Sequence, residues 1–334
     1  MSVRSKWQSL PTEAINPGTL AIDKLSSVDI VESMLNEDRK MLAAVQREKE
    51  RIAVGVDIIA QALRKKGRVI FVGAGTSGRL GVLESAEMPT TFGTDSDLVL
   101  AIMAGGKNAF LKAKEGVEDN YEEGARAIVR LKPTRQDVVI GVSASGMTPF
   151  VRGALTRARR VGSRIIFVTC DPRTELQTFV DITIAPAVGP EVIAGSTRLK
   201  AGTATKIVLN MLTTAAMIRI GKTYGNLMVD VEVGSQQRRD RALRIIMIVT
   251  DLEYEDADRL LRQAHWDVKA AIVMQKGGLT YARAVSRLRK AHDSVRDAIG
   301  EDIEPRLREL LEHHAVNSPG SSDAREKPPT PRAR

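Results

Sequence analysis

The sequence is poor in cysteine, in aromatic residues and in long apolar runs, and each shortage narrows what the protein can be. Its one cysteine, Cys170, has no partner for an internal disulfide, which favours a cytoplasmic location. Aromatic residues make up 4% of the chain and hydrophobic residues 43%, so aliphatic side chains build the core. That composition suits a helix-covered sheet better than an all-β sandwich. No apolar run approaches a membrane span or a leader segment.

The formal charge of +9 raises the question of an anionic partner. Lys and Arg are mostly mixed with Asp and Glu, and no basic run is interleaved with aromatic residues. This pattern argues against nucleic acid and favours a small anion. With one cysteine and four histidines we expect no metal site.

Strand-like and helix-like segments alternate through the first two thirds of the chain, which predicts an α/β fold with a doubly wound, mainly parallel sheet. The predicted strands are 68–73, 98–104, 137–142, 164–169 and 181–185. The predicted helices are 31–66, 79–88, 109–117, 121–130, 149–161 and 199–221. Beyond residue 234 only short amphipathic helices follow, which indicates a small C-terminal helical domain.

We therefore divide the chain into four parts. Residues 1–30 form an N-terminal arm, and 31–232 form the sheet domain with its preceding helix. Residues 233–300 form the helical domain, and 301–334 form a helical end followed by a basic tail rich in Ser and Pro, which we expect to be disordered.

The segment Gly73-Ala-Gly-Thr-Ser-Gly78 lies between a buried strand and a helix, where backbone N–H groups and a helix N-terminus can bind a phosphate. The hydroxyls of Thr76 and Ser77 add hydrogen-bonding groups, and Gly78 permits a close approach. The segment matches the dinucleotide fingerprint, but the second strand ends in Gly105-Gly-Lys107 without the acid that would hold a ribose. The P-loop pattern fails too, because no Gly-Lys-Ser/Thr closes the loop.

A second hydroxyl-rich loop, Ser143-Ala-Ser-Gly-Met-Thr148, follows the third predicted strand. Loops at the carboxyl ends of neighbouring parallel strands converge on one ligand. Ser143, Ser145 and Thr148 therefore join the first loop as candidate contacts to a phosphorylated sugar. A purely structural alternative is that both loops are tight turns with helix-capping hydroxyls.

Several blocks of sequence now carry a resemblance. The two loops look like those of the sugar isomerase (SIS) family. Five further blocks extend it: 83–89 (LESAEMP), 103–106 (MAGG), 115–119 (EGVED), 195–206 (GSTRLKAGTATK) and 225–230 (GNLMVD). Over roughly residues 20–300 the chain resembles the N-acetylmuramic acid 6-phosphate etherase family, whose C-terminal helices resemble a ubiquitin-associated module. Two departures are Met147, where that family usually has Arg, and the Ser-Pro-rich tail.

The resemblance implies a carbon–oxygen lyase that needs no cofactor and converts N-acetylmuramic acid 6-phosphate and water to N-acetylglucosamine 6-phosphate and D-lactate. It implies Glu87 as the acid that protonates the departing lactate oxygen and Glu118 as the group that transfers the C2 proton. Apart from the resemblance, Arg79 and Lys200 are candidate positive charges for the substrate, each with the alternative of a structural ion pair, and Ser196 is a weaker candidate contact. Without the resemblance both glutamates could be ordinary helix residues.

Two other functions stay open on sequence alone. A non-enzymatic sugar-phosphate regulator would keep the phosphate loops, and an aldose–ketose isomerase needs a similar proton transfer at C2. The resemblance also implies a homodimer, a small sugar phosphate as the ligand, and neither a nucleic-acid nor a membrane partner.

Overall fold

The structure, a computed structural model, describes the backbone of residues 10–317 and the side chains of residues 10–312. The chain divides into two compact units between Lys222 and Thr223. The sequence-based division into four parts puts the boundary between the sheet domain and the helical domain ten residues later, after residue 232. That division stays a prediction. The first nine residues and the Ser-Pro-rich part of the tail lie outside the described residues.

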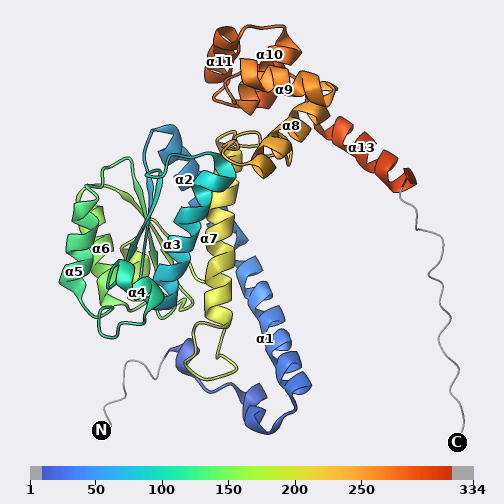
Figure 1. Ribbon diagram of the computed structural model, residues 1–334. Coiled ribbons are helices and arrows are strands. Elements are labelled where there is room, and N and C mark those ends of the chain that lie inside the picture. The colour runs from blue at the N-terminus through green and yellow to red at the C-terminus, as the bar shows by residue number, and fades with distance from the viewer. Residues whose placement is uncertain (1–9, 318–334) are drawn as a thin grey trace, which may run out of the picture. The chain divides into compact units, whose positions relative to one another are not determined.

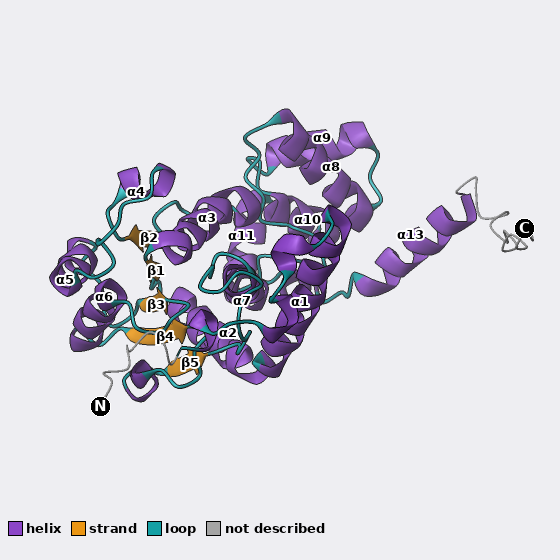
Figure 2. Cartoon of the chain, turned by 90° about the horizontal axis from the view of Figure 1, so that it is seen from below, coloured by secondary structure: helices purple, strands orange, loops and turns teal. Residues whose placement is uncertain are grey.

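The first unit contains a five-stranded sheet with helices on both faces (Figure 1, Figure 2). The strands are β1 (Val69–Gly73), β2 (Val99–Met103), β3 (Val138–Val142), β4 (Arg164–Val168) and β5 (Ile182–Ile184). The helices are α1 (Ser27–Arg47), α2 (Lys49–Arg64), α3 (Gly75–Phe92), α4 (Lys107–Leu111), α5 (Tyr121–Arg130), α6 (Pro149–Arg160) and α7 (Lys200–Arg219). Short 3-10 helices are η2 (Pro11–Glu13), η3 (Pro17–Thr19), η4 (Ile22–Lys24) and η5 (Glu175–Thr178).

All neighbouring strands pair in parallel, in the order β2-β1-β3-β4-β5. The predicted α/β fold with a parallel sheet is confirmed. The chain goes from β1 outward to β2 and then returns to β3 on the other side of β1, so the connections leave in opposite directions between β1 and β3. Such a switch point opens a crevice at the carboxyl ends of the two strands.

Alternate residues of each strand enter two different cores. Phe71, Ile140 and Ile166 pack against the layer of α1, α2, α3 and α7. Val72, Val139 and Phe167 pack against α5 and α6 on the opposite face. Because both faces are covered, the strands read as continuous apolar runs, as the sequence shows.

The predicted helix 31–66 is two helices, which is a correction to the sequence-based expectation. The chain leaves helical geometry at Glu48 (φ −90°, ψ 4°), between α1 and α2. The Glu48 carboxylate accepts the backbone N–H of Ala185, just after β5, at 3.0 Å. Glutamate is an ordinary helix residue, so nothing at Glu48 in the sequence indicates that the helix ends there.

The second unit consists of helices packed around an aliphatic core. They are α8 (Gln236–Thr250), α9 (Tyr254–Gln263), α10 (Val268–Gly277), α11 (Tyr281–Lys290), α12 (Val295–Ile299) and α13 (Glu304–Asn317). Tyr224, Val229 and Val231 from the preceding segment are buried in the same core, so this segment belongs to the helical unit. Across the described residues of the whole chain, no helix has the length and apolarity needed to cross a membrane.

Candidate active site

The N-terminus of α3 is open to an anion. Its N-cap residue, Ala74, has extended backbone geometry and no side chain that could cap the helix. Gly78 N–H bonds back to Ala74 O at 3.1 Å, which leaves the N–H groups of Gly75, Thr76 and Ser77 at the helix start. Unpartnered N–H groups at the positive end of an 18-residue helix form an anion site.

Gly78, predicted to contact the substrate, lies at a close approach of two backbones. A Cβ on Gly78 would lie 2.8 Å from Gly73 O and 2.7 Å from Met103 Cγ. The missing side chain therefore lets α3 approach the ends of β1 and β2 closely. Gly78 is buried behind the loop and does not line the cavity described below.

The second loop presents a cluster of hydroxyls. Ser143 Oγ lies 2.7 Å from Thr148 Oγ1 and 3.5 Å from Ser145 Oγ. Thr148 is the N-cap of α6, yet its side chain makes no capping bond to the helix. Because the hydroxyls bond to one another rather than to the helix, they can turn toward a ligand.

Both loops line one cavity of about 430 Å³, at the switch point between β1 and β3. This volume lies within the usual range for small-molecule sites. Six predicted site residues line it: Thr76, Ser77, Glu118, Ser143, Ser145 and Thr148. The structure therefore brings the two hydroxyl loops and one of the two candidate catalytic acids together.

Glu118 lies in the segment between α4 and α5. The prediction of a helix over 109–117 is wrong in this segment. Helix α4 ends at Leu111, and Gly116 has a left-handed backbone (φ +76°). Glu118 O accepts the N–H of Phe150, in the first turn of α6, at 2.9 Å. This bond fixes the backbone of the half-buried Glu118 beside the second loop. It also occupies an N–H that α6 would otherwise offer to a ligand.

The helix pair next to Glu118 is packed backbone to backbone. A Cβ on Gly124 of α5 would overlap Phe150 O, and a Cβ on Gly153 of α6 would overlap Tyr121 O. The two helices therefore approach more closely than any side chain permits. Their contact holds the Glu118 segment against the second loop.

Glu87 lies elsewhere. It is exposed on α3, three turns beyond the first loop, and does not line the cavity. One turn earlier, the buried Glu84 accepts hydrogen bonds from Asn210 Nδ2 (2.6 Å) and the Thr213 hydroxyl, both on α7. Burial raises the pKa of Glu84, and these bonds and the charge of Lys206 oppose the rise. Glu84 thus fixes α3 on α7.

Ser196 and Lys200 do not line the cavity either. The Glu191 carboxylate caps α7 by accepting the N–H groups of Lys200 (2.9 Å) and Ala201 (3.0 Å). The Lys200 ammonium is buried and bonds to Glu37. Burial works against a charged Glu37, but hydrogen bonds from Lys200 and Lys40 outweigh it and lower the pKa of Glu37.

The cavity also includes polar residues that the sequence reasoning did not select, among them Glu13, Thr197 and Thr205. Thr197 and Thr205 belong to the 195–206 block, and the hydroxyl groups of that block could have identified them as candidate site residues. Glu13 comes from the N-terminal arm, where no periodicity marks it. Arg79 lines the cavity as well, with its guanidinium bonded to Ala109 O and Phe110 O.

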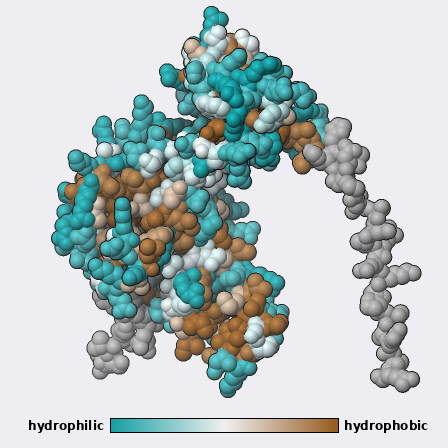
Figure 3. Space-filling view, viewed as in Figure 1, coloured by the Kyte–Doolittle hydropathy of each residue, from teal (hydrophilic) through white to brown (hydrophobic). Residues whose placement is uncertain are grey.

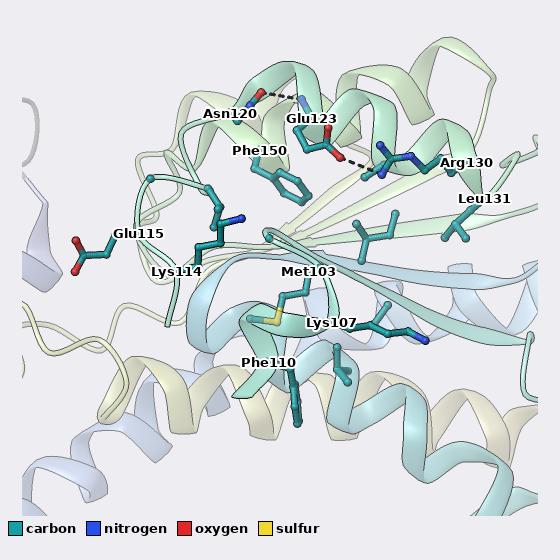
Figure 4. A pocket seen from close by; sticks show the side chains of 18 residues that line it. Met103, Lys107, Phe110, Lys114, Glu115, Asn120, Glu123, Arg130, Leu131 and Phe150 are labelled. Atoms are coloured by element: carbon teal, nitrogen blue, oxygen red, sulfur yellow. Dashed lines mark hydrogen bonds and ion pairs between the residues drawn. The ribbon is translucent and has the colours of Figure 1, made fainter. Parts of the chain in front are cut away.

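A second cavity, of about 930 Å³, adjoins the first on the side of the edge strand β2. Figure 4 shows Met103 and Phe150 turned into it, with the ion pair of Glu123 and Arg130 at its rim. The two cavities share Met103, Lys114, Glu115 and Val117. Within the part of the chain that the structure describes, no group of three His, Cys, Asp or Glu side chains is placed to hold a metal ion.

Comparisons with known proteins show the family to which the chain belongs. Residues 51–159 match the family model of the glucokinase regulatory protein N-terminal SIS domain, which places the sheet and its two loops in the SIS class. A solved phosphoheptose isomerase from Francisella tularensis is similar at 17% identity and a TM-score of 0.44, covering 57% of this chain and 98% of that one.

Full-length relatives define the family more narrowly. N-acetylmuramic acid 6-phosphate etherase 2 of Vibrio cholerae serotype O1 is 45% identical over 295 residues, or 88% of this chain and 96% of its own. The etherase of Caldanaerobacter subterraneus subsp. tengcongensis is 44% identical over 292 residues, covering 87% and 95%. The chain belongs to the N-acetylmuramic acid 6-phosphate etherase family.

Proposed function

We propose that this protein is a carbon–oxygen lyase that cleaves the C3 lactyl ether of N-acetylmuramic acid 6-phosphate. Water is consumed, and the products are N-acetylglucosamine 6-phosphate and D-lactate. The observation that carries the proposal is the near full-length identity of about 45% to proteins named for this activity. The cavity supports it, since an open helix N-terminus and two hydroxyl loops suit a phosphorylated sugar.

The phosphate would lie at the start of α3. There the N–H groups of Gly75, Thr76 and Ser77 and the loop hydroxyls donate to its oxygens. Ser143, Ser145 and Thr148 would contact the phosphate or the sugar hydroxyls. Ser196 and Lys200 stay predictions without a place in this cavity.

The reaction would begin with the open-chain sugar, in which the C1 aldehyde acidifies the C2 proton. Glu118 removes that proton, the C3–O bond breaks, and Glu87 protonates the departing lactate oxygen. Water then adds across the C2=C3 double bond, placing its oxygen on C3 and a proton on C2. No electrons are exchanged with an external partner, so the sequence is complete without a redox cofactor.

The test is an assay of purified protein with N-acetylmuramic acid 6-phosphate, with D-lactate as the readout. We expect lactate release that Glu118→Gln lowers by at least a hundredfold, the usual contribution of an acid–base group. Glu122→Gln is a matched control, because Glu122 is an exposed carboxylate close by that does not line the cavity. A folded wild type that binds the sugar phosphate without releasing lactate would favour the regulator instead.

We also propose that two copies form a homodimer in the cytoplasm. Four apolar side chains on α1 support association, because they lie on one side of the helix and more than half of each is exposed. Val28, Leu35 and Leu42 follow one another at intervals of seven residues, and Val31 lies one turn after Val28. The exposed fractions are 75% for Val28, 55% for Val31, 53% for Leu35 and 54% for Leu42. Hydrophobic residues also gather around the lower end of α1 in Figure 3. The cytoplasmic location rests on the single, buried cysteine.

A further inference from the structure

The N-terminal arm reaches the cavity that contains both hydroxyl loops and Glu118. Its contribution is Glu13, at the end of the short helix η2. The residues around Glu13 are closely packed, because Leu10 is 3% exposed, Thr12 1% and Asn16 6%. Burial on both sides of Glu13 fixes the arm against the rest of the first unit and so holds Glu13 at the cavity.

Hydrogen bonds fasten the arm to the segment that precedes α7. Asn16 Nδ2 donates to Pro190 O at 3.3 Å, and the Thr19 hydroxyl donates to Val192 O at 2.9 Å. The arm accordingly lies beside the loop that leads into α7 (Figure 1). The same loop brings Thr197 to the cavity. The arm and this loop therefore line one part of the cavity together.

The Glu13 carboxylate is placed by a glycine of that loop. A Cβ on Gly195 would lie 3.0 Å from Glu13 Oε2, so the carboxylate lies against the backbone of Gly195 more closely than a side chain there would allow. Within the described part of the chain, Glu13 forms a hydrogen bond only through its backbone N–H, to Leu10 O at 3.1 Å. Both carboxylate oxygens are therefore available to a ligand.

The carboxyl groups that line the cavity come from two separate parts of the chain. Three of them share the short segment between α4 and α5, whereas the fourth comes from the arm: Glu115, Glu118, Asp119 and Glu13. A substrate bound between the hydroxyl loops thus meets carboxylates from two segments. Such a pair can serve proton transfers at different atoms of one substrate.

The proposed reaction includes a step that no residue named so far assists. The C2 proton becomes acidic only when the sugar ring is open, and opening moves two protons and breaks one bond. A proton leaves the hydroxyl on C1, the C1–O5 bond breaks, and a proton arrives at O5. Glu118 is assigned to the C2 proton and Glu87 to the lactate oxygen. Because O1 and O5 are bonded to the same carbon, the two oxygens of one carboxylate can reach both.

We propose that Glu13 opens the sugar ring, as a catalytic residue that contacts O1 and O5 of the bound substrate. This inference rests on the proposed function. The Glu13 carboxylate takes the proton of the C1 hydroxyl, the electron pair of that O–H bond forms the C1=O1 carbonyl, and the electron pair of the C1–O5 bond goes to O5. Protonated Glu13 then delivers the same proton to O5, which regenerates the carboxylate without a further reactant.

Anomer exchange of the product sugar isolates this step from the lyase reaction. A ring that opens and closes interconverts the α and β anomers of N-acetylglucosamine 6-phosphate, and exchange spectroscopy by nuclear magnetic resonance measures the rate. The protein used is Glu118→Gln, in which proton transfer at C2 is removed. We expect this variant to accelerate the exchange. The double variant Glu13→Gln/Glu118→Gln should lose at least about a hundredfold of that acceleration, the usual contribution of an acid–base group.

Asp23→Asn in the same Glu118→Gln background is the matched control. Asp23 is an exposed carboxylate of the same arm that does not line the cavity, so the exchange should be unchanged. In otherwise wild-type protein, Glu13→Gln should lower kcat for D-lactate release at least about tenfold, because the ring then opens without assistance. Thermal unfolding should match that of the wild type within about 0.5 kcal/mol, because the replaced group is exposed.

Three results would overturn the inference while leaving the lyase activity in place. One is equal exchange in the double variant and in Glu118→Gln. Another is Glu118→Gln protein that binds the sugar phosphate without accelerating its exchange. The third is loss of exchange when Glu115→Gln, rather than Glu13→Gln, is added to Glu118→Gln. Wild-type protein without D-lactate release would overturn the proposed function and the inference with it.

Discussion

Two helices in the sheet unit, α3 and α7, begin after similar sequences and have different roles. A segment of glycine and hydroxyl residues marks each start: 73–78 includes the first turn of α3, and 195–199 precedes α7. At α3 the first N–H groups are left without a capping side chain. At α7 the carboxylate of Glu191 already occupies them. The difference shows that a glycine-hydroxyl loop marks an anion site only when no acid of the same chain reaches the helix start.

The strongest test of this comparison removes the buried cation at the start of α7. Lys200→Met removes the buried ammonium partner of the Glu37 carboxylate and leaves it bonded to the exposed Lys40 alone. Breaking a buried pair in this way costs about 3–5 kcal/mol of the free energy of unfolding. Chemical denaturation of both proteins measures the difference.

The matched control is Lys40→Met, because Lys40 bonds to the same Glu37 carboxylate but is 67% exposed. An exposed partner contributes about 1 kcal/mol or less. Equal losses in the two variants would mean that Lys200 is not structural, and would return it to the list of substrate contacts.

The next effect concerns the cap itself. Glu191→Ala leaves the N–H groups of Lys200 and Ala201 without an acceptor in a buried position. We expect a loss of about 2 kcal/mol or more, because each of the two unpaired buried donors costs about 1–3 kcal/mol. Thermal unfolding followed by circular dichroism measures it. Glu191→Gln keeps one acceptor oxygen and should recover much of the loss; no recovery would argue against the capping role.

The smallest effect is expected at α3, and on binding rather than folding. Ser77→Ala removes a hydroxyl from the open helix start, and hydrogen bonds to a charged group contribute about 1.5–3 kcal/mol. The KM for the sugar phosphate should rise by one to two orders of magnitude, while stability stays within about 0.5 kcal/mol.

Steady-state kinetics with Ser85→Ala as the control checks the Ser77 prediction. Ser85 lies on the same helix, and its hydroxyl bonds to Val82 O rather than facing the cavity. An unchanged KM in Ser77→Ala would mean that the first loop does not hold the phosphate.

The sheet could be predicted because each strand is a short apolar run bounded by clear turn signals, as around Val138–Val142. The position of the two hydroxyl loops could be predicted as well, since a loop at the carboxyl end of a parallel strand has only one edge of the sheet to occupy. The break at Glu48 could not, because its cause is a hydrogen bond to Ala185, far away along the chain.

The site was predictable only in part. Glu118 was selected from a resemblance, and its place depends on a backbone bond from Phe150 that no local pattern encodes. Lys200 looked like a charge for the substrate because Glu37, its partner, precedes it by more than 160 residues. Glu87 was also selected from the resemblance, and it lies ten residues beyond Ser77 on α3, about 15 Å along the helix axis.

The packing of α5 against α6 has a consequence for how this sequence can vary. At Gly124 and Gly153 even a methyl group would occupy the space of a neighbouring carbonyl oxygen. In a deep mutational scan selected for growth on the amino sugar, these two glycines should tolerate as few replacements as Glu118, although neither approaches the substrate. In such a scan, positions that tolerate no replacement would include residues that only hold the backbone in place as well as residues that take part in the reaction.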